Sequence, residues 1–176
     1  MNKAYLLYVG NLYPHKNVSI LIQAAEKSKI KLKIVCARSV FENKLPKSDY
    51  VEYLGRISDS DLVSLYKNAL CFVFPSKIEG FGLPGLEAMS AGCPVIAARA
   101  SCLPEIYGNA AIYFDPDNLN DLISKINSVI SDKNLVKSLV AKGKLQVKKY
   151  SWAKMSNKTW EIYQSVLKSH TPERGS

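Results

Sequence analysis

Residues 70–92 read LCFVFPSKIEGFGLPGLEAMSAG and contain an apolar run, a glycine-rich turn and a helical segment, in that order. The run at 70–74 is continuous and rich in aromatic and aliphatic residues, which predicts a strand buried on both faces. Pro84 suits the start of a helix, and Gly92 suits its end. The turn therefore lies where the chain leaves the carboxyl end of a strand and enters a helix. That is where open α/β sheets bind ligands.

Similar apolar runs recur along the chain, and helical patterns lie between several of them. The predicted strands are 5–9, 32–36, 50–54, 70–74, 94–98 and 110–114, and the predicted helices between them are 17–29, 59–68 and a helix from about Pro84 to Gly92. This alternation predicts an α/β fold with a doubly wound, Rossmann-like parallel sheet. Extra C-terminal helices are expected at 118–131, 133–149 and 152–168.

The composition is that of one folded domain, with 176 residues of which 47% are hydrophobic and 22% charged. Residues 1–170 are expected to form this domain, and 171–176 a disordered tail or an expression remnant. No export signal or long apolar run is apparent, so the expected location is cytoplasmic. The four cysteines form no C-x-x-C pair, which favours buried thiols over disulfides or zinc.

The formal net charge of +9 would favour nucleic acid, anionic lipid or phosphorylated small molecules without choosing among them. The lysines are densest in the C-terminal third, where helical spacing is typical of a solvated face. Nucleic-acid binding would rest on charge alone and is not predicted. Peripheral contact with the inner face of a membrane is kept as a hypothesis.

The turn itself supports two interpretations. Gly80, Gly82 and Gly85 fit the G-x-G-x-x-G spacing of a dinucleotide-binding turn, and amides without a neighbouring Cβ can approach a diphosphate at a helix N-terminus. That fingerprint should follow the first strand of its unit, however, whereas this turn follows the fourth predicted strand. Glu79 and Glu87 instead straddle the turn, and carboxylates accept hydrogen bonds from vicinal sugar hydroxyls. Each acid taken singly is equally a solvated loop residue or a helix-dipole acid.

The spacing Glu79-x7-Glu87 within residues 75–97 resembles the signature of the retaining, GT-B-fold glycosyltransferases of group 1. Residues 8–17 (YVGNLYPHKN), 53–76, 103–116 (LPEIYGNAAIYFDP) and 150–167 resemble further segments of the same family. The resemblance covers only the C-terminal, donor-binding domain of such an enzyme. We therefore expect the N-terminal acceptor domain to lie outside this chain.

Roles follow from the resemblance position by position. It implies that Glu79 holds donor-sugar hydroxyls and that Lys16 neutralises the departing diphosphate, which makes these two the expected catalytic residues. Glu87 would hold the ribose, and the remaining donor-binding positions would be Gly10, Asn11, Gly55, Arg56, Ile57, Gly80, Phe81, Gly82 and Leu83. The family often has arginine at the position of Asn11, so Lys16 is left more alone in balancing the diphosphate charge.

The resemblance implies transfer of a hexose from a nucleotide sugar to a glycan or lipid-linked acceptor, without a metal or cofactor. Residues 13–17 and 103–111 are most similar to mannosyltransferase-type members, so GDP-mannose is the expected donor. Two alternatives stay open: a non-catalytic nucleotide or nucleotide-sugar binding module, and a basic nucleic-acid or membrane-surface domain.

Two further patterns receive structural interpretations. Asp115-Pro116-Asp117 imitates a D-x-D metal motif, but a proline turn followed by a helix N-cap at Asp117 or Asn118 is favoured. Trp152, Trp160 and Tyr163 are expected to pack on this domain or on the missing half of the enzyme.

Overall fold

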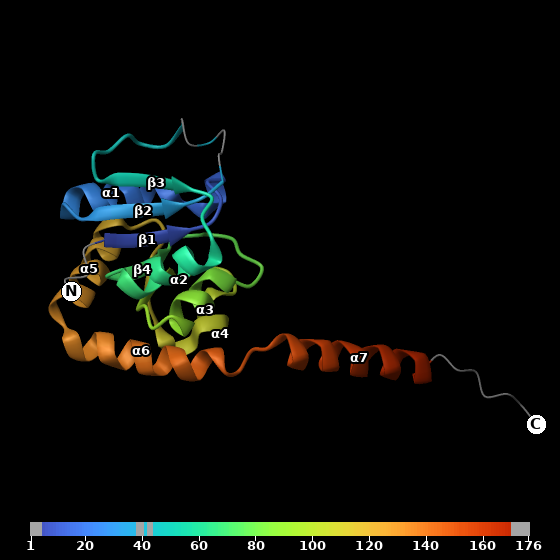
Figure 1. Cartoon of the computed structure of the whole chain (residues 1–176). Coiled ribbons are helices and arrows are strands. Elements are labelled where there is room, and N and C mark those ends of the chain that lie inside the picture. Colours follow the sequence, from blue (N-terminus) through green and yellow to red (C-terminus); the bar gives the residue numbers. More distant parts are fainter. Residues whose placement is uncertain (1–4, 38–40, 42–43, 170–176) are drawn as a thin grey trace, which may run out of the picture.

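The computed structural model describes residues 5–37, 41 and 44–169, which fold around a six-stranded, wholly parallel sheet (Figure 1). The strands are β1 (Tyr5–Val9), β2 (Lys31–Val35), β3 (Val51–Gly55), β4 (Cys71–Phe74), β5 (Val95–Ala98) and β6 (Ala111–Phe114). Their order across the sheet is β3-β2-β1-β4-β5-β6. The doubly wound sheet predicted from the alternation of strands and helices is confirmed.

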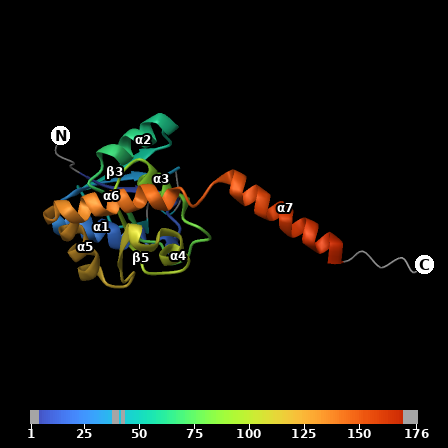
Figure 2. The same ribbon diagram turned by 90° about the horizontal axis from the view of Figure 1, so that it is seen from below.

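Helices cover both faces of the sheet (Figures 1 and 2). They are α1 (Val18–Ser28), α2 (Asp59–Asn68), α3 (Leu83–Ser90), α4 (Leu103–Tyr107), α5 (Leu119–Ser131), α6 (Lys133–Val147) and α7 (Trp152–Ser169), with 3-10 turns η1 (Pro14–Lys16) and η3 (Gly108–Ala110). α1 packs beside α5 on one face, α2 packs beside α3 on the other, and α6 crosses beneath α3.

Side-chain caps fix two of the predicted helix starts. The Ser58 hydroxyl accepts a hydrogen bond from the Asp61 amide at 3.2 Å, and the Asn118 side chain accepts one from the Asp121 amide at 3.0 Å. In the turn before α5, the Asp115 carboxylate accepts from the Asp117 amide at 3.0 Å. The turn and cap predicted for the D-P-D stretch are therefore confirmed.

α4 has no counterpart in the sequence prediction. It is five residues long and buries Leu103, Ile106 and Tyr107, so it is too short to show an amphipathic repeat. Its burial comes from packing beneath the turn that opens α3, which is a tertiary contact.

The central strands supply the core. Every residue of β4 and β5 is buried, as expected of strands covered on both faces, and Cys36, Cys71 and Cys93 lie in the core as predicted. Within the part of the chain that the structure describes, no helix has both the length and the apolar character needed to cross a membrane.

α7 leaves the domain and projects away from it (Figures 1 and 2). Trp152 is 72% exposed, and Trp160 and Tyr163 are each 61% exposed. The prediction that these rings pack on this domain is therefore wrong for the chain by itself, and packing on another half of the protein stays a prediction. The tail expected at 171–176 lies outside the described residues.

Candidate active site

The candidate site lies at the carboxyl ends of β1 and β4, which are neighbours in the sheet although η1, α1, β2, β3 and α2 lie between them along the chain. The strand order reverses at this point, which is where open α/β sheets bind ligands. A backbone hydrogen bond of 2.8 Å from the Lys77 amide to the His15 carbonyl joins the loops that follow these two strands.

Lys16 and Glu79 meet between these two loops. The Lys16 ammonium donates to Glu79 Oε1 at 2.6 Å, and only 15% and 10% of the two side chains is exposed. Lys16 stands at the end of the η1 turn, which Pro14 begins and Asn17 ends in a left-handed conformation with φ 55°. The Asn17 side-chain amide donates to the Pro116 carbonyl at 2.8 Å, so the turn that presents Lys16 is anchored to a third loop.

The backbone of Glu79 is held from the loop after β5. The Ser101 hydroxyl donates to the Glu79 carbonyl at 2.9 Å and accepts from the Glu79 amide at 3.3 Å. The Cys102 thiol donates to the same carbonyl at 3.3 Å. Ser101 has φ 54°, a left-handed conformation that is uncommon for residues other than glycine. Sequence reasoning missed Ser101, because no local pattern links a serine to a glutamate 22 residues before it.

The three glycines of the turn have different roles. Gly82 has φ 88°, and a Cβ on Gly82 or on Gly85 would overlap the Tyr107 ring and its hydroxyl. Tyr107 donates its hydroxyl to the Gly82 carbonyl at 2.5 Å. A Cβ on Gly80 would meet nothing within 4 Å. Gly82 and Gly85 are therefore needed for packing on Tyr107, and the approach of the turn amides to a phosphate stays a prediction.

The turn after β4 leads directly into the N-terminus of α3. Gly82 is the N-cap, Pro84 lies in the first turn as predicted, and no side chain caps the helix. The first amides of α3 therefore carry the partial positive charge of the helix end without a side-chain acceptor. Such a helix end favours an anionic ligand.

Glu87 lies one turn further along α3, on its exposed side. The buried Tyr66 of α2 donates its hydroxyl to Glu87 Oε2 at 3.2 Å. Burial first, and then the Glu87 carboxylate, raise the pKa of Tyr66, so the phenol stays protonated and keeps donating. Tyr66 is a second residue that the sequence did not reveal.

A groove of about 760 Å³ runs from Glu87 toward the start of α7. Phe81 and Leu83 line it, and the Phe81 ring meets Tyr150 edge to face with centroids 5.4 Å apart. Lys16 and Glu79 are not among its lining residues. The predicted site residues therefore fall into two groups. Lys16 and Glu79 form a pair, whereas Phe81, Leu83 and Glu87 line the groove.

The other predicted residues also lie at the carboxyl ends of strands. Gly10 follows β1, and its amide donates to the Val35 carbonyl at 3.0 Å. The exposed Asn11 uses its side-chain oxygen locally, accepting from the Tyr13 amide at 3.3 Å. Gly55 ends β3, the strand at one edge of the sheet, and Arg56 and Ile57 follow it before α2. Among the described contacts, no hydrogen bond joins these three to Lys16, Glu79 or Glu87.

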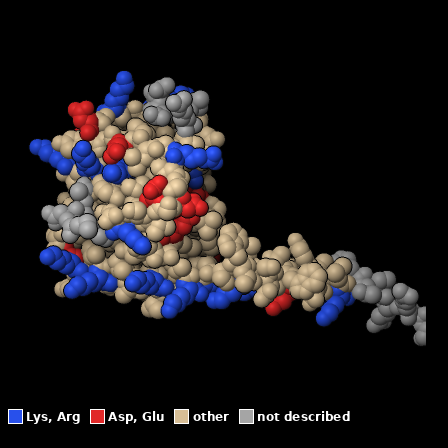
Figure 3. All heavy atoms as spheres, in the orientation of Figure 1, with Lys and Arg blue, Asp and Glu red and all other residues tan. Residues whose placement is uncertain are grey.

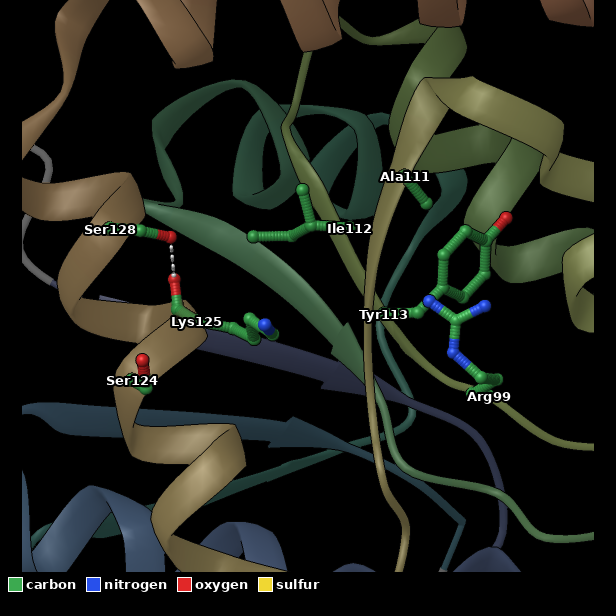
Figure 4. A pocket seen from close by; sticks show the side chains of 7 residues that line it. All are labelled: Arg99, Ala111, Ile112, Tyr113, Ser124, Lys125 and Ser128. Atoms are coloured by element: carbon green, nitrogen blue, oxygen red, sulfur yellow. Dashed lines mark hydrogen bonds between the residues drawn. The ribbon is translucent and has the colours of Figure 1, made fainter.

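A second hollow of about 400 Å³ lies at β6, the strand at the far edge of the sheet. Figure 4 shows Arg99 and Tyr113 on one side of β6, and Lys125, Ser124 and Ser128 of α5 on the other. The Arg99 guanidinium lies over the Tyr113 ring at 5.2 Å, and Lys125 pairs with Asp121 at 3.3 Å. The two cations therefore do not converge on one point, and the hollow is not part of the site.

The described residues hold no group of three or more His, Cys, Asp or Glu side chains placed to bind a metal ion. Asp117 of the D-P-D turn instead forms an ion pair with Lys77. The site is therefore built from one lysine, two separate carboxylates, backbone amides and a helix N-terminus.

A parallel sheet of this strand order, with helices on both faces and a helix N-terminus at its switch point, defines a doubly wound α/β domain. The chain belongs to the family of glycosyl transferases group 1, which its residues 1–146 match. It is 32% identical over 174 residues to the O-antigen chain mannosyltransferase B of Escherichia coli, covering 92% of this chain and 46% of that protein. The chain thus spans about half the length of this curated relative.

Two solved structures agree with the fold. Sucrose-phosphate synthase from Thermosynechococcus elongatus superposes with a TM-score of 0.81 at 25% identity, over 96% of this chain and 46% of that one. The C-terminal domain of a glycosyl transferase group 1 family protein (LpcC) from Francisella tularensis has a TM-score of 0.70 at 25% identity, over 82% of this chain and 85% of that one. The second comparison matches this chain to a domain that was solved separately.

Proposed function

We propose that the chain is the donor-binding half of a retaining glycosyltransferase that takes a hexose from a nucleotide sugar and transfers it to a glycan or lipid-linked acceptor. The observation that carries the proposal is the Lys16–Glu79 pair, 2.6 Å apart beside the uncapped N-terminus of α3. The pair lies where a nucleotide diphosphate would meet a helix end, and the family assignment supports the reaction class.

The pair can serve two parts of one donor. An ammonium group has three N–H donors, so Lys16 can bond Glu79 and still direct two donors to the departing diphosphate. Glu79 uses Oε1 for Lys16, which leaves Oε2 to accept hydrogen bonds from sugar hydroxyls. Fixed charges and amides of this kind stabilise a leaving group without reorganising during the reaction. No metal or cofactor is required by this arrangement.

The other end of the donor would lie toward Glu87. The amides of Gly82 and Leu83 would meet the diphosphate at the helix start, and Glu87 would accept hydrogen bonds from the ribose hydroxyls. Tyr66 supports this role, because its hydrogen bond to Oε2 fixes the carboxylate and leaves Oε1 available. Gly10 and Asn11 would border the phosphates, Gly80 and Phe81 the sugar, and Gly55, Arg56 and Ile57 the base.

GDP-mannose is the donor that we propose, since residues 13–17 and 103–111 are similar to mannosyltransferase-type sequences and a 32% identical relative is named a mannosyltransferase. The acceptor domain would lie in the part of the protein that corresponds to the rest of such relatives. The exposed apolar side chains of α7 would pack on that part. Residues 1–170 would together form the donor-binding half.

Calorimetry with UDP-, GDP- and ADP-sugars tests the proposal directly. We expect GDP-mannose to bind, and Lys16→Ala to weaken binding of GDP more than binding of GMP, because a point charge beside the second phosphate distinguishes the two. Lys67→Ala, an exposed lysine of α2, is the matched control and should change neither affinity. If no nucleotide or nucleotide sugar binds, the site is wrong, and if Lys16→Ala weakens both ligands equally, Lys16 does not contact the second phosphate.

A further inference from the structure

The positive charge of the protein is concentrated in one segment. Residues 133–160 contain eight lysines and no Asp or Glu, so they account for eight of the nine net positive charges, and the rest of the chain carries +1. All eight side chains are exposed. Of the four ion pairs among the described residues, none includes one of these lysines.

The largest part of this charge lies on α6. We define the basic face as the exposed lysines of this helix and of the two residues after it: Lys133, Lys137, Lys142, Lys144, Lys148 and Lys149. Asp132, which directly precedes α6 in the chain, caps the helix by accepting from the amides of Asn134 and Leu135 at 2.8 and 2.9 Å. Figure 3 shows basic side chains in a row along the lower edge of the molecule, where α6 runs.

The basic face has an apolar centre. At 100° per residue, Lys133, Lys137, Lys144 and Lys148 fall on one side of the exposed face of α6, and Lys142 and Lys149 fall on the other. Ala141 and Leu145 lie between the two rows, and Leu145 is 64% exposed. The opposite side of the helix buries Leu139, Gly143 and Gln146 against the domain. The outward side of α6 is therefore itself amphipathic.

We propose that the basic face of α6 is a docking surface for the anionic lipid headgroups of a membrane. Lysines that flank an apolar side chain can hold their ammonium groups at the headgroup level while the apolar side chain enters the interface. α6 is 15 residues long, hence about 22 Å, and lies along the outside of the domain, so it can lie flat on a surface (Figure 2). This proposal does not depend on the function proposed for the site at Lys16 and Glu79.

The chemistry of the face favours lipid over nucleic acid. Residues 133–160 contain no arginine, the side chain best suited to two-point recognition of phosphate and to base contacts. The exposed Leu145 at the centre of the face adds nothing to phosphate contacts. It would be stabilised by burial at the boundary between headgroups and acyl chains. In Figure 1 the strands run roughly along α6, so a protein lying on this face would direct the carboxyl ends of its strands sideways, along the membrane surface.

Vesicle sedimentation tests the proposal with the chain of residues 1–176 and two kinds of vesicle, phosphatidylcholine alone and phosphatidylcholine with one quarter phosphatidylglycerol. Each lysine near an anionic surface contributes about a fivefold gain in partitioning. The variant Lys137→Glu/Lys144→Glu/Lys148→Glu should therefore partition at least about 100-fold less into the anionic vesicles. Leu145→Ser should lower partitioning about fivefold. This loss should persist when salt is added, because salt screens the lysines but not the burial of an apolar side chain.

The matched control is Lys27→Glu/Lys31→Glu/Lys67→Glu, which alters three exposed lysines elsewhere. Three changes of two charges each lower the formal charge from +9 to +3 in both variants. Circular dichroism and urea denaturation confirm that each variant is folded. The proposal is overturned by equal losses in both variants, by equal binding to neutral vesicles, or by the absence of vesicle binding. Tighter binding to a duplex DNA, lost in the α6 variant and unchanged in Leu145→Ser, would assign the surface to nucleic acid instead.

Discussion

At the scale of single residues, Glu79 and Glu87 have different surroundings and should behave differently toward a bare nucleoside diphosphate. We expect Glu87→Ala to weaken binding by about 1.5–3 kcal/mol, since the ribose loses a charged acceptor. Glu79→Gln should not weaken the binding of the nucleoside diphosphate. Removing the Glu79 carboxylate charge frees the Lys16 ammonium for phosphate. Calorimetry with GDP checks both. A larger loss for Glu79→Gln would mean that the two acids are assigned the wrong way round.

Ser101 offers a second test at this scale. Its hydroxyl holds both backbone polar groups of Glu79 from a left-handed conformation, so Ser101→Gly relieves the backbone strain while removing both hydrogen bonds. We expect this variant to fold normally, to exchange the Glu79 amide proton faster, and to lose affinity for the nucleotide sugar but not for the nucleoside diphosphate. Equal losses for both ligands would show that Ser101 acts on the fold rather than through Glu79.

At the scale of an element, the turn between β4 and α3 depends on the close approach of Tyr107. A methyl group at Gly85 would overlap the Tyr107 ring, and overpacking of this kind costs about 1–3 kcal/mol. Gly85→Ala should therefore lower the free energy of unfolding by that amount, as measured by urea denaturation. Gly80→Ala is the control: its Cβ would enter open space, and its stability effect should stay within about 0.5 kcal/mol. If Gly80→Ala is the more damaging, the described turn is wrong.

At the scale of the whole molecule, three buried tyrosines couple stability to alkaline pH. Burial raises the pKa of Tyr8, Tyr66 and Tyr107 above the usual 10.0. Below pH 10 both folded and unfolded states keep these protons, so their contribution to stability is complete. Above it the unfolded chain loses protons that the folded protein retains, and stability falls by about 1.4 kcal/mol per pH unit for each tyrosine.

The measurement is urea denaturation between pH 9 and 11. Replacing any one of the three by phenylalanine should reduce the loss of stability between these two pH values by about 1.4 kcal/mol. Tyr163→Phe on the exposed α7 is the control for the substitution itself. An unchanged loss in all three core variants would contradict the burial described for these rings.

Activity is also a property of the whole molecule. Residues 1–176 should bind a nucleoside diphosphate or its sugar but show negligible transfer, because we propose that the acceptor site lies in another domain. Orienting two reactants contributes about 7–11 kcal/mol, and closure of a second domain excludes water. Radiolabelled donors tested against glycan and lipid-linked acceptors, with the chain alone and joined to an acceptor domain, measure this. Efficient transfer by the chain alone would contradict the proposal that it is half of an enzyme.

The sequence by itself determined the sheet, the principal helices and the family. Continuous apolar runs and helical periods are local patterns, and they located all six strands and the helices that carry a clear repeat, including the Ser58 and Asn118 caps. The spacing of Glu79 and Glu87 around the turn was likewise legible, because both residues belong to one continuous motif.

Only the tertiary structure decided which side chains meet. Lys16 and Glu79 are 63 residues apart, and Tyr66 and Glu87 are 21 apart, so their contacts depend on the order of strands in the sheet rather than on any repeat. Ser101 reaches Glu79 because β5 lies beside β4, and Tyr107 explains two glycines because α4 folds beneath the turn. The physical reason is that hydrogen bonding and close packing act between surfaces brought together by folding, whereas periodicity records only which side of an element is buried.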